Sequence, residues 1–332
     1  MKVAVLYPTV AALIEKLAAI FPGLVVVGPP CDDIDKWDKR ILPLAKAIGR
    51  QEEWKELGLD IHFDERPYSQ IDFSKYDLLI ESVETFFYSQ DWKNHCTRVE
   101  CPIIVKSCWT GSLRDLPESY IERVSRFPMI LEMPSHYEFW KKSPFNDVTL
   151  VPNAVGDWWF ERPWTGSNKV ALFVLAGKDI WRPPDKTVCG VDLWERLEER
   201  FPGRTLHHDG GVNFKTGREM TELFSECRVF VNLDREYARP LTTTFTEALA
   251  AGMPVVARDH PTLSYNQFID YNGVCTEDFE VMCGFIDQFL TDYEFAKESS
   301  ERSREIGRQF FSTDAVRPVY EAAAMRARLA FR

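Results

Sequence analysis

The sequence predicts an α/β protein with two doubly wound parallel-sheet domains that face each other across a ligand-binding cleft. Short apolar runs alternate with segments of helical periodicity, which is the pattern of parallel strands joined by crossover helices. The alternation stops at residues 152–156 (Pro-Asn-Ala-Val-Gly) and then begins again. A chain of 332 residues is long enough for two domains of ordinary size. We therefore expect a first domain over residues 1–155 and a second over 156–312, followed by a C-terminal helix at 313–332.

The first half contains short apolar runs that we expect to form one parallel sheet. Helical periodicity follows the first run at residues 10–20, and a charged, tryptophan-bearing segment covers 32–57. Ligands bind at the carboxyl ends of the strands in such sheets, so residues after each run are candidates for function. The expected strands are residues 2–7, 24–27, 76–80, 103–106 and 129–132.

The second half repeats the alternation with apolar strands and helices of its own. Gly252 is expected to be the left-handed residue that ends one of these helices, and Pro254 prevents that helix from continuing. The tail from 279 to 331 is expected to be helical. The expected strands are residues 170–175, 205–208, 229–232, 255–257 and 273–274, and the expected helices before the tail are 191–200, 218–226 and the one that contains Glu247.

Composition and charge exclude several classes of protein. Hydrophobic residues make up 45% and charged residues 27%, as in soluble globular proteins. The formal net charge of −11 argues against sequence-independent binding to nucleic acid. No run approaches the roughly 20 apolar residues that a membrane-spanning helix needs. The 8 cysteines show no zinc-type spacing, and several lie in apolar runs. We therefore expect reduced thiols, a cytoplasmic location and no transmembrane segment.

The segment 239–257 carries the most specific signal in the chain. A loop rich in hydroxyl groups precedes a short helix, and the N–H groups of Thr243, Thr244 and Phe245 would face a phosphate at its positive end. Glu247, about one turn later, could accept hydrogen bonds from two neighbouring sugar hydroxyls. The alternative is an ordinary amphipathic helix whose early Glu only complements the helix dipole.

This segment resembles the nucleotide-sugar motif of GT-B glycosyltransferases, above all the retaining glycosyltransferase family 4. That motif is Glu-x7-Glu followed by a Gly, a Pro and a strand; Glu247 matches its second Glu, and Arg239 stands where the first is expected. Residues 152–156 likewise resemble the Pro-Asn-Gly-Val-Asp that ends the family's first domain, with Ala154 and Gly156 as departures. The resemblance implies two Rossmann-like domains, a last helix that packs back on the first, and retention of the anomeric configuration.

The resemblance also implies the positions of the donor site. Lys178 and Arg182, after the first strand of the second half, are candidates for binding the diphosphate. Thr242 is a further candidate for the diphosphate, together with Thr243 and Thr244. Phe214 is a candidate for the base, and Arg239 would reach phosphate or sugar. No metal is expected, because helix N–H groups and basic side chains replace it in relatives. The His-His-Asp sequence at 207–209 is interpreted as a polar turn, since neighbouring strand side chains point to opposite faces.

The first half is expected to hold the acceptor and any catalytic base. Glu81 and Glu84 follow the expected strand at 76–80, and either could remove the proton of an acceptor hydroxyl, although both could simply start a helix. Trp109 and Ser112 follow the next strand and are candidates for acceptor contact, where relatives often have a His.

The sequence thus predicts a glycosyltransferase that moves a sugar from a UDP- or GDP-sugar to an acceptor hydroxyl. The acceptor stays open: a glycan, a small molecule, or a hydroxymethylated DNA base as in small phage enzymes of this fold. Two other functions also stay open. A nucleotide-sugar epimerase would share the fold, and a non-catalytic binding protein would explain the replacement of the motif's first Glu by Arg239.

Overall fold

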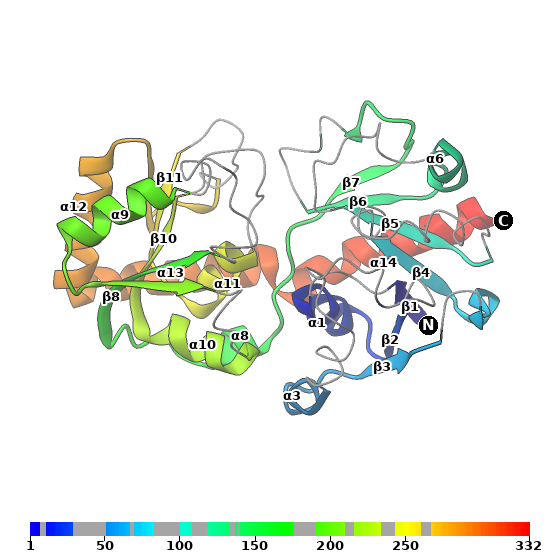
Figure 1. Ribbon diagram of the computed structural model, residues 1–332, viewed down its shortest axis with the longest axis horizontal. Coiled ribbons are helices and arrows are strands. Elements are labelled where there is room, and N and C mark those ends of the chain that lie inside the picture. The colour runs from blue at the N-terminus through cyan, green and yellow to red at the C-terminus, as the bar shows by residue number, and fades with distance from the viewer. Residues whose placement is uncertain are drawn as a thin grey trace. The chain divides into compact units, whose positions relative to one another are not determined.

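The computed structural model forms two compact units, which Figure 1 shows with their helices and strands labelled. The first unit comprises Met1–Pro152 together with Val316–Arg332, and the second comprises Asn153–Ala315. The structure describes residues 1–6, 11–28, 51–66, 70–82, 100–107, 118–132, 137, 140–175, 190–209, 216–233, 243–259 and 267–332.

The first unit contains a parallel sheet of seven strands in the order β3-β2-β1-β4-β5-β6-β7. Two of these strands, β3 and β7, were not among those predicted from the sequence. Both are edge strands and only partly buried, so they lack the continuous apolar runs of the interior strands. The strands are β1 (Val3–Leu6), β2 (Leu24–Val27), β3 (Ile61–Asp64), β4 (Leu78–Ser82), β5 (Ile103–Ser107), β6 (Met129–Leu131) and β7 (Val148–Leu150).

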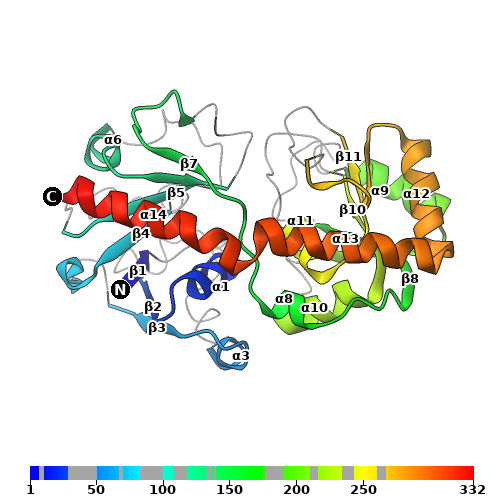
Figure 2. The ribbon, with the colours of Figure 1, turned by 180° about the vertical axis from the view of Figure 1, so that it is seen from behind.

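The last helix of the chain, α14 (Thr313–Phe331), packs along the first unit, as Figure 2 shows from behind. Arg317 donates hydrogen bonds to the carbonyl oxygens of Ile20 (2.8 Å) and Ala19 (3.1 Å). Farther along the helix, Arg326 donates to Asp147 Oδ2 at 2.6 Å. The other described helices of this unit are α1 (Ala11–Ile20), α3 (Gln51–Glu56), the 3-10 turn η3 (Phe73–Lys75) and α6 (Glu118–Val124).

The second unit contains a parallel sheet of five strands in the order β12-β11-β10-β8-β9. Two parallel sheets, each with helices, confirm the predicted α/β fold class. The strands are β8 (Asn168–Leu175), β9 (Thr205–Asp209), β10 (Cys227–Asn232), β11 (Val255–Arg258) and β12 (Gly273–Thr276). The helices are α8 (Trp158–Glu161), α9 (Val191–Arg200), α10 (Gly217–Glu226), α11 (Thr243–Ala251), α12 (Phe279–Thr291) and α13 (Tyr293–Phe311).

The helical tail is divided into α12, α13 and α14 because carboxylates start two of these helices. Asp278 Oδ1 accepts a hydrogen bond from Glu280 N at 2.8 Å at the start of α12, and Asp292 Oδ1 accepts one from Phe295 N at 3.1 Å at the start of α13. The helical tail predicted from periodicity is therefore three helices, and the N-caps of α12 and α13 mark two of their starts. Among the helices that the structure describes, none is long and apolar enough to cross a membrane.

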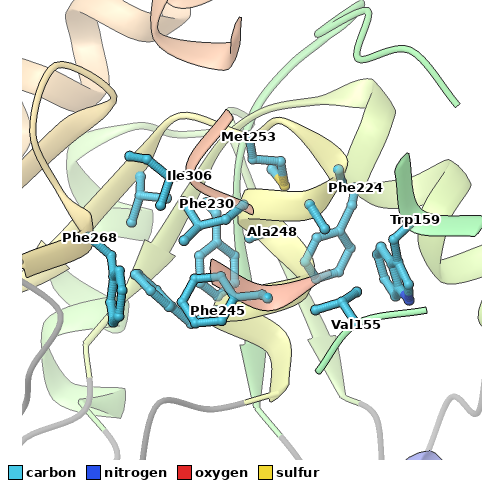
Figure 3. Packing of buried hydrophobic residues seen from close by; sticks show 14 of the residues in the cluster. Val155, Trp159, Phe224, Phe230, Phe245, Ala248, Met253, Phe268 and Ile306 are labelled. Carbon is cyan, nitrogen blue, oxygen red and sulfur yellow. The ribbon is translucent and has the colours of Figure 1, made fainter. Parts of the chain in front are cut away.

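Alternating side chains of the second sheet belong to two separate hydrophobic clusters, one on each face of the sheet. Phe230 of β10 belongs to the cluster that contains α11 residues Phe245 and Ala248, whereas Val229 and Val231 face the cluster under α9 and α12. Figure 3 shows the first cluster, in which the Phe224 ring lies 5.3 Å from that of Trp159 and 5.9 Å from that of Phe230. This packing holds α11 against one face of the sheet.

Candidate functional site

Helix α11 lies in a β-α-β unit, and this connection fixes the direction in which it points. It joins β10 to β11, which are parallel neighbours with Phe230 paired to Val255 and Asn232 to Ala257. A helix that connects two parallel strands runs antiparallel to them, so it begins at their carboxyl ends. Thr243, the first residue of α11, is therefore at the edge of the sheet where α/β folds bind ligands.

The end of α11 has the geometry that the sequence predicts. Gly252 has a φ of +81°, in the left-handed region that favours glycine. The N–H of Gly252 donates to Leu249 O at 3.0 Å, and the N–H of Met253 donates to Ala248 O at 2.9 Å, which is the Schellman arrangement. This motif satisfies helix carbonyls that would otherwise lack partners and turns the chain into β11.

Helix α13 fixes the position of α11 through close packing and buried hydrogen bonds. Gly307 lies so near α11 that a Cβ at this position would be 3.0 Å from Ala250 Cα. The Ser303 hydroxyl donates to Met253 O at 2.6 Å and accepts from Asn272 Nδ2 at 3.2 Å, with both side chains buried. Arg304 Nη2 donates to Ala251 O at 3.5 Å, so a cation lies at the negative end of the α11 dipole.

Three of the predicted donor-binding residues lie at the start of α11. Thr243 and Thr244 are its first two residues, and Glu247 is about one turn later; all three are partly buried. Thr246 Oγ1 donates to the backbone carbonyl oxygen of Thr243 at 3.0 Å, so the Thr246 hydroxyl bonds within the helix. Thr243, Thr244 and Glu247 thus occupy one end of one helix at the carboxyl edge of the second sheet. Their contacts with a nucleotide stay a prediction.

The strand order identifies the part of this edge where ligand binding is favoured. From β8 the chain continues to β9 on one side, and then crosses to β10 on the other side of β8. Such a reversal between neighbouring strands is the topological switch point at which doubly wound folds bind ligands. Leu172 of β8 pairs with Phe230 of β10, so the two strands end at nearly the same level.

The remaining donor candidates lie outside the described residues but follow strands of this edge in the sequence. Lys178 and Arg182 come after β8, Phe214 after β9, and Arg239 and Thr242 between β10 and α11. In the sequence, Lys178 and Arg182 thus follow one of the two strands that flank the switch point, and Arg239 and Thr242 follow the other.

In the first unit, the candidate base Glu81 is part of a buried ion pair. It lies within β4 rather than after a strand, and its residue is 1% exposed. Arg123 of α6 donates to both carboxylate oxygens, from Nη1 to Oε1 at 3.2 Å and from Nη2 to Oε2 at 3.1 Å. A carboxylate held in this way serves first as the counter-ion of a buried guanidinium. Its catalytic role stays a prediction, and Glu84, Trp109 and Ser112 lie outside the described residues.

A second buried ion pair at the same edge was not predicted from the sequence. Lys106 Nζ lies 2.8 Å from Glu132 Oε2, and these side chains are 1% and 6% exposed. The sequence indicates these residues only by a Lys directly after the apolar run Ile-Ile-Val in β5 and a Glu directly after Met-Ile-Leu in β6. Only the pairing of β5 with β6 brings the two residues together.

The His-His-Asp sequence lies at the end of β9. The ring of His207 packs 5.6 Å from that of Phe173 and 6.5 Å from that of Trp194, and His208 is buried. Within the described ranges, no group of three or more His, Cys, Asp or Glu side chains is arranged to hold a metal ion.

Comparison with known proteins finds no matching family model and no matching curated protein. Solved structures do match over nearly the whole chain. A glycosyltransferase from Rickettsia africae ESF-5 is 10% identical, with a TM-score of 0.61 and 98% of both chains covered. HepE from Anabaena, solved with UDP and glucose, is 11% identical, with a TM-score of 0.63 over 98% of this chain and 99% of HepE. An alpha-glucosyltransferase solved with UDP is 12% identical, with a TM-score of 0.62 over 98% of this chain and 100% of that one.

The chain has the GT-B fold. Both sheets contribute to this match, since it covers 98% of the chain. The GT-B resemblance predicted from the segment around Glu247 is thereby confirmed at the level of fold. In this GT-B chain, α11 and the switch point between β8 and β10 make up the candidate donor site.

Proposed function

We propose that this protein transfers a hexose from a nucleotide-diphosphate sugar to an acceptor hydroxyl, with UDP-glucose as the first donor to test. The observation that carries the proposal is the position of Glu247, one turn into a helix that starts beside the switch point of a GT-B fold. The HepE structures with UDP and glucose and with UDP-glucose support this choice of donor.

In the proposed donor complex, Glu247 accepts hydrogen bonds from the two ribose hydroxyls, and the N-terminus of α11 faces the diphosphate. Helix N–H groups and the helix dipole both favour an anion at that position. Lys178, Arg182 and Arg239 supply positive charge, since they follow strand ends at the same edge. Positive charge there stabilises the negative charge that grows on the leaving phosphate in the transition state.

The first unit would hold the acceptor. We propose retention of the anomeric configuration, because the segment around Glu247 resembles the motif of retaining enzymes. Arg239, which stands where that motif has its first Glu, would then contact the donor phosphate or the transferred sugar. The stereochemistry is measured by following the anomeric proton of the product by NMR during turnover.

The proposal is tested by UDP binding and by slow hydrolysis of UDP-glucose, UDP-galactose and GDP-mannose, with Glu247→Ala as the variant. Hydrogen bonds to a carboxylate contribute roughly 1.5–3 kcal/mol, so we expect Kd for UDP to rise about 10- to 150-fold. Glu301→Ala is the matched control, because Glu301 is an exposed acid on α13.

Each outcome of this experiment has a distinct meaning. An unchanged Kd in Glu247→Ala removes Glu247 from the ribose role. UDP binding without turnover of any donor would instead indicate a non-catalytic nucleotide-binding protein. Formation of a new sugar isomer without acceptor would indicate an epimerase.

A further inference from the structure

Four buried charges are gathered at the carboxyl ends of three neighbouring strands in the first unit. Glu81 lies near the end of β4, Lys106 near the end of β5, and Glu132 directly after β6. The fourth charge, on Arg123 of α6, pairs with Glu81, and Lys106 pairs with Glu132 at 2.8 Å. The preceding residues of the same strands are apolar and buried.

The two ion pairs lie on opposite faces of the sheet. In β4·β5 pairing, Glu81 is level with Val105 and Ser82 with Lys106, and in β5·β6 pairing Lys106 is level with Ile130. Adjacent residues of a strand point to opposite faces, so Glu81 and Lys106 point away from each other. The carboxyl edge of the sheet is therefore charged on both faces, and the Lys106–Glu132 pair links the ends of β5 and β6 directly.

Stability alone is a weak reason for such a pair. Removing two charges from water costs free energy that their mutual attraction often does not recover, and well-packed apolar residues of similar volume are frequently as stable or more stable. The carboxyl ends of the strands are instead the edge at which α/β folds bind their ligands. The location of Glu81, Lys106 and Glu132 at the carboxyl ends of three neighbouring strands fits that second explanation.

We propose that the Lys106–Glu132 ion pair positions the acceptor-binding edge of the first unit for sugar transfer. The inference rests on the proposed function. It assigns positioning roles in the transfer reaction to Lys106 and Glu132, which do not contact the donor. Lys106 holds the Glu132 carboxylate at the end of β6, and Glu132 holds the end of β5, from which the acceptor candidates Trp109 and Ser112 follow in the sequence. Fixing these strand ends fixes where an acceptor oxygen can be held for attack.

The test replaces the pair by apolar residues of similar size in the double variant Lys106→Met/Glu132→Leu. Either single substitution removes only one charge of a buried pair and can prevent folding, whereas the double variant removes both charges. The matched control is Asp147→Leu/Arg326→Met, which removes an ion pair of the same unit at the amino end of β7. Melting temperature, Kd for UDP, and kcat and KM for UDP-glucose hydrolysis, with water as acceptor, are measured for each protein.

We expect the double variant to melt at or above the temperature of the unaltered protein and to keep its Kd for UDP within about twofold. Its hydrolysis kcat falls at least about tenfold with KM unchanged, while the control keeps kcat. A double variant with full kcat overturns the inference, and so does one that loses UDP affinity in parallel with kcat, which would reveal a general structural role. If the unaltered protein binds no UDP and cleaves no UDP-sugar, the proposed function is refuted, and the inference that rests on it is refuted as well.

Discussion

Two helix-interior glycines of the second unit should respond with opposite sign to the same substitution. Gly307 of α13 is buried against α11, and Gly284 of α12 is exposed with no neighbouring atom within 4 Å of an added Cβ. Replacing a helical Gly by Ala stabilises the helix by about 1 kcal/mol, so we expect Gly284→Ala to raise the free energy of unfolding by about that amount.

At Gly307 the same gain is opposed by a steric cost. The added Cβ would lie 3.0 Å from Ala250 Cα, Ala250 N and Leu249 C, all backbone atoms that no side-chain rotation can move. Overpacking of this kind costs roughly 1–3 kcal/mol, so the net change should be a loss of about 1 kcal/mol. Because α11 has to shift to relieve the contact, Kd for UDP should also rise in Gly307→Ala and stay constant in Gly284→Ala.

Denaturation by urea, followed by tryptophan fluorescence, gives the midpoint and slope for each variant. Ligand affinity is measured by calorimetry on the same preparations. A Gly307→Ala protein that is stabilised as much as Gly284→Ala would refute the close packing of α13 on α11. A destabilised Gly307→Ala protein with unchanged Kd for UDP would instead show that the packing of α13 on α11 does not affect UDP binding.

Two further predictions concern buried ionisable groups. Glu81→Gln removes the carboxylate charge from its buried, bidentate pair with Arg123 and should lower the free energy of unfolding by roughly 3–5 kcal/mol; a loss below about 1 kcal/mol in urea denaturation would contradict the buried pair. Burial raises the pKa of the Cys101 and Cys227 thiols to about 12, above the roughly 8.5 of an exposed thiol. The folded chain should therefore lose stability as the pH rises above about 8.5, and both thiols should resist iodoacetamide at pH 9, as peptide mass spectrometry can check.

The interior strands could be predicted from the sequence because burial on both faces requires continuous apolar runs. The edge strands β3 and β7 could not, since a strand with one open side tolerates residues such as His62 and Thr149. The cap at Gly252 was predictable because it depends on local backbone conformation alone. Local signals thus account for most of the strands and for the position of α11.

Pairs between distant segments could not be predicted from one sequence. Glu81 and Arg123 are 42 residues apart, and neither neighbourhood shows that α6 packs beside β4. Lys106 and Glu132 meet only because β5 and β6 are neighbours in the sheet. The chemical type of these side chains was visible in the sequence, whereas their partners depend on strand order.

The split of the first unit between two stretches of the chain has a consequence for its synthesis. Residues 153–315 form the second unit without a break and can fold as soon as they leave the ribosome. The first unit is complete only with Val316–Arg332, whose Arg317 and Arg326 donate hydrogen bonds to Ile20 O and Asp147 Oδ2. During translation, the amino-terminal sheet therefore stays without its bracing helix until after the later unit has emerged.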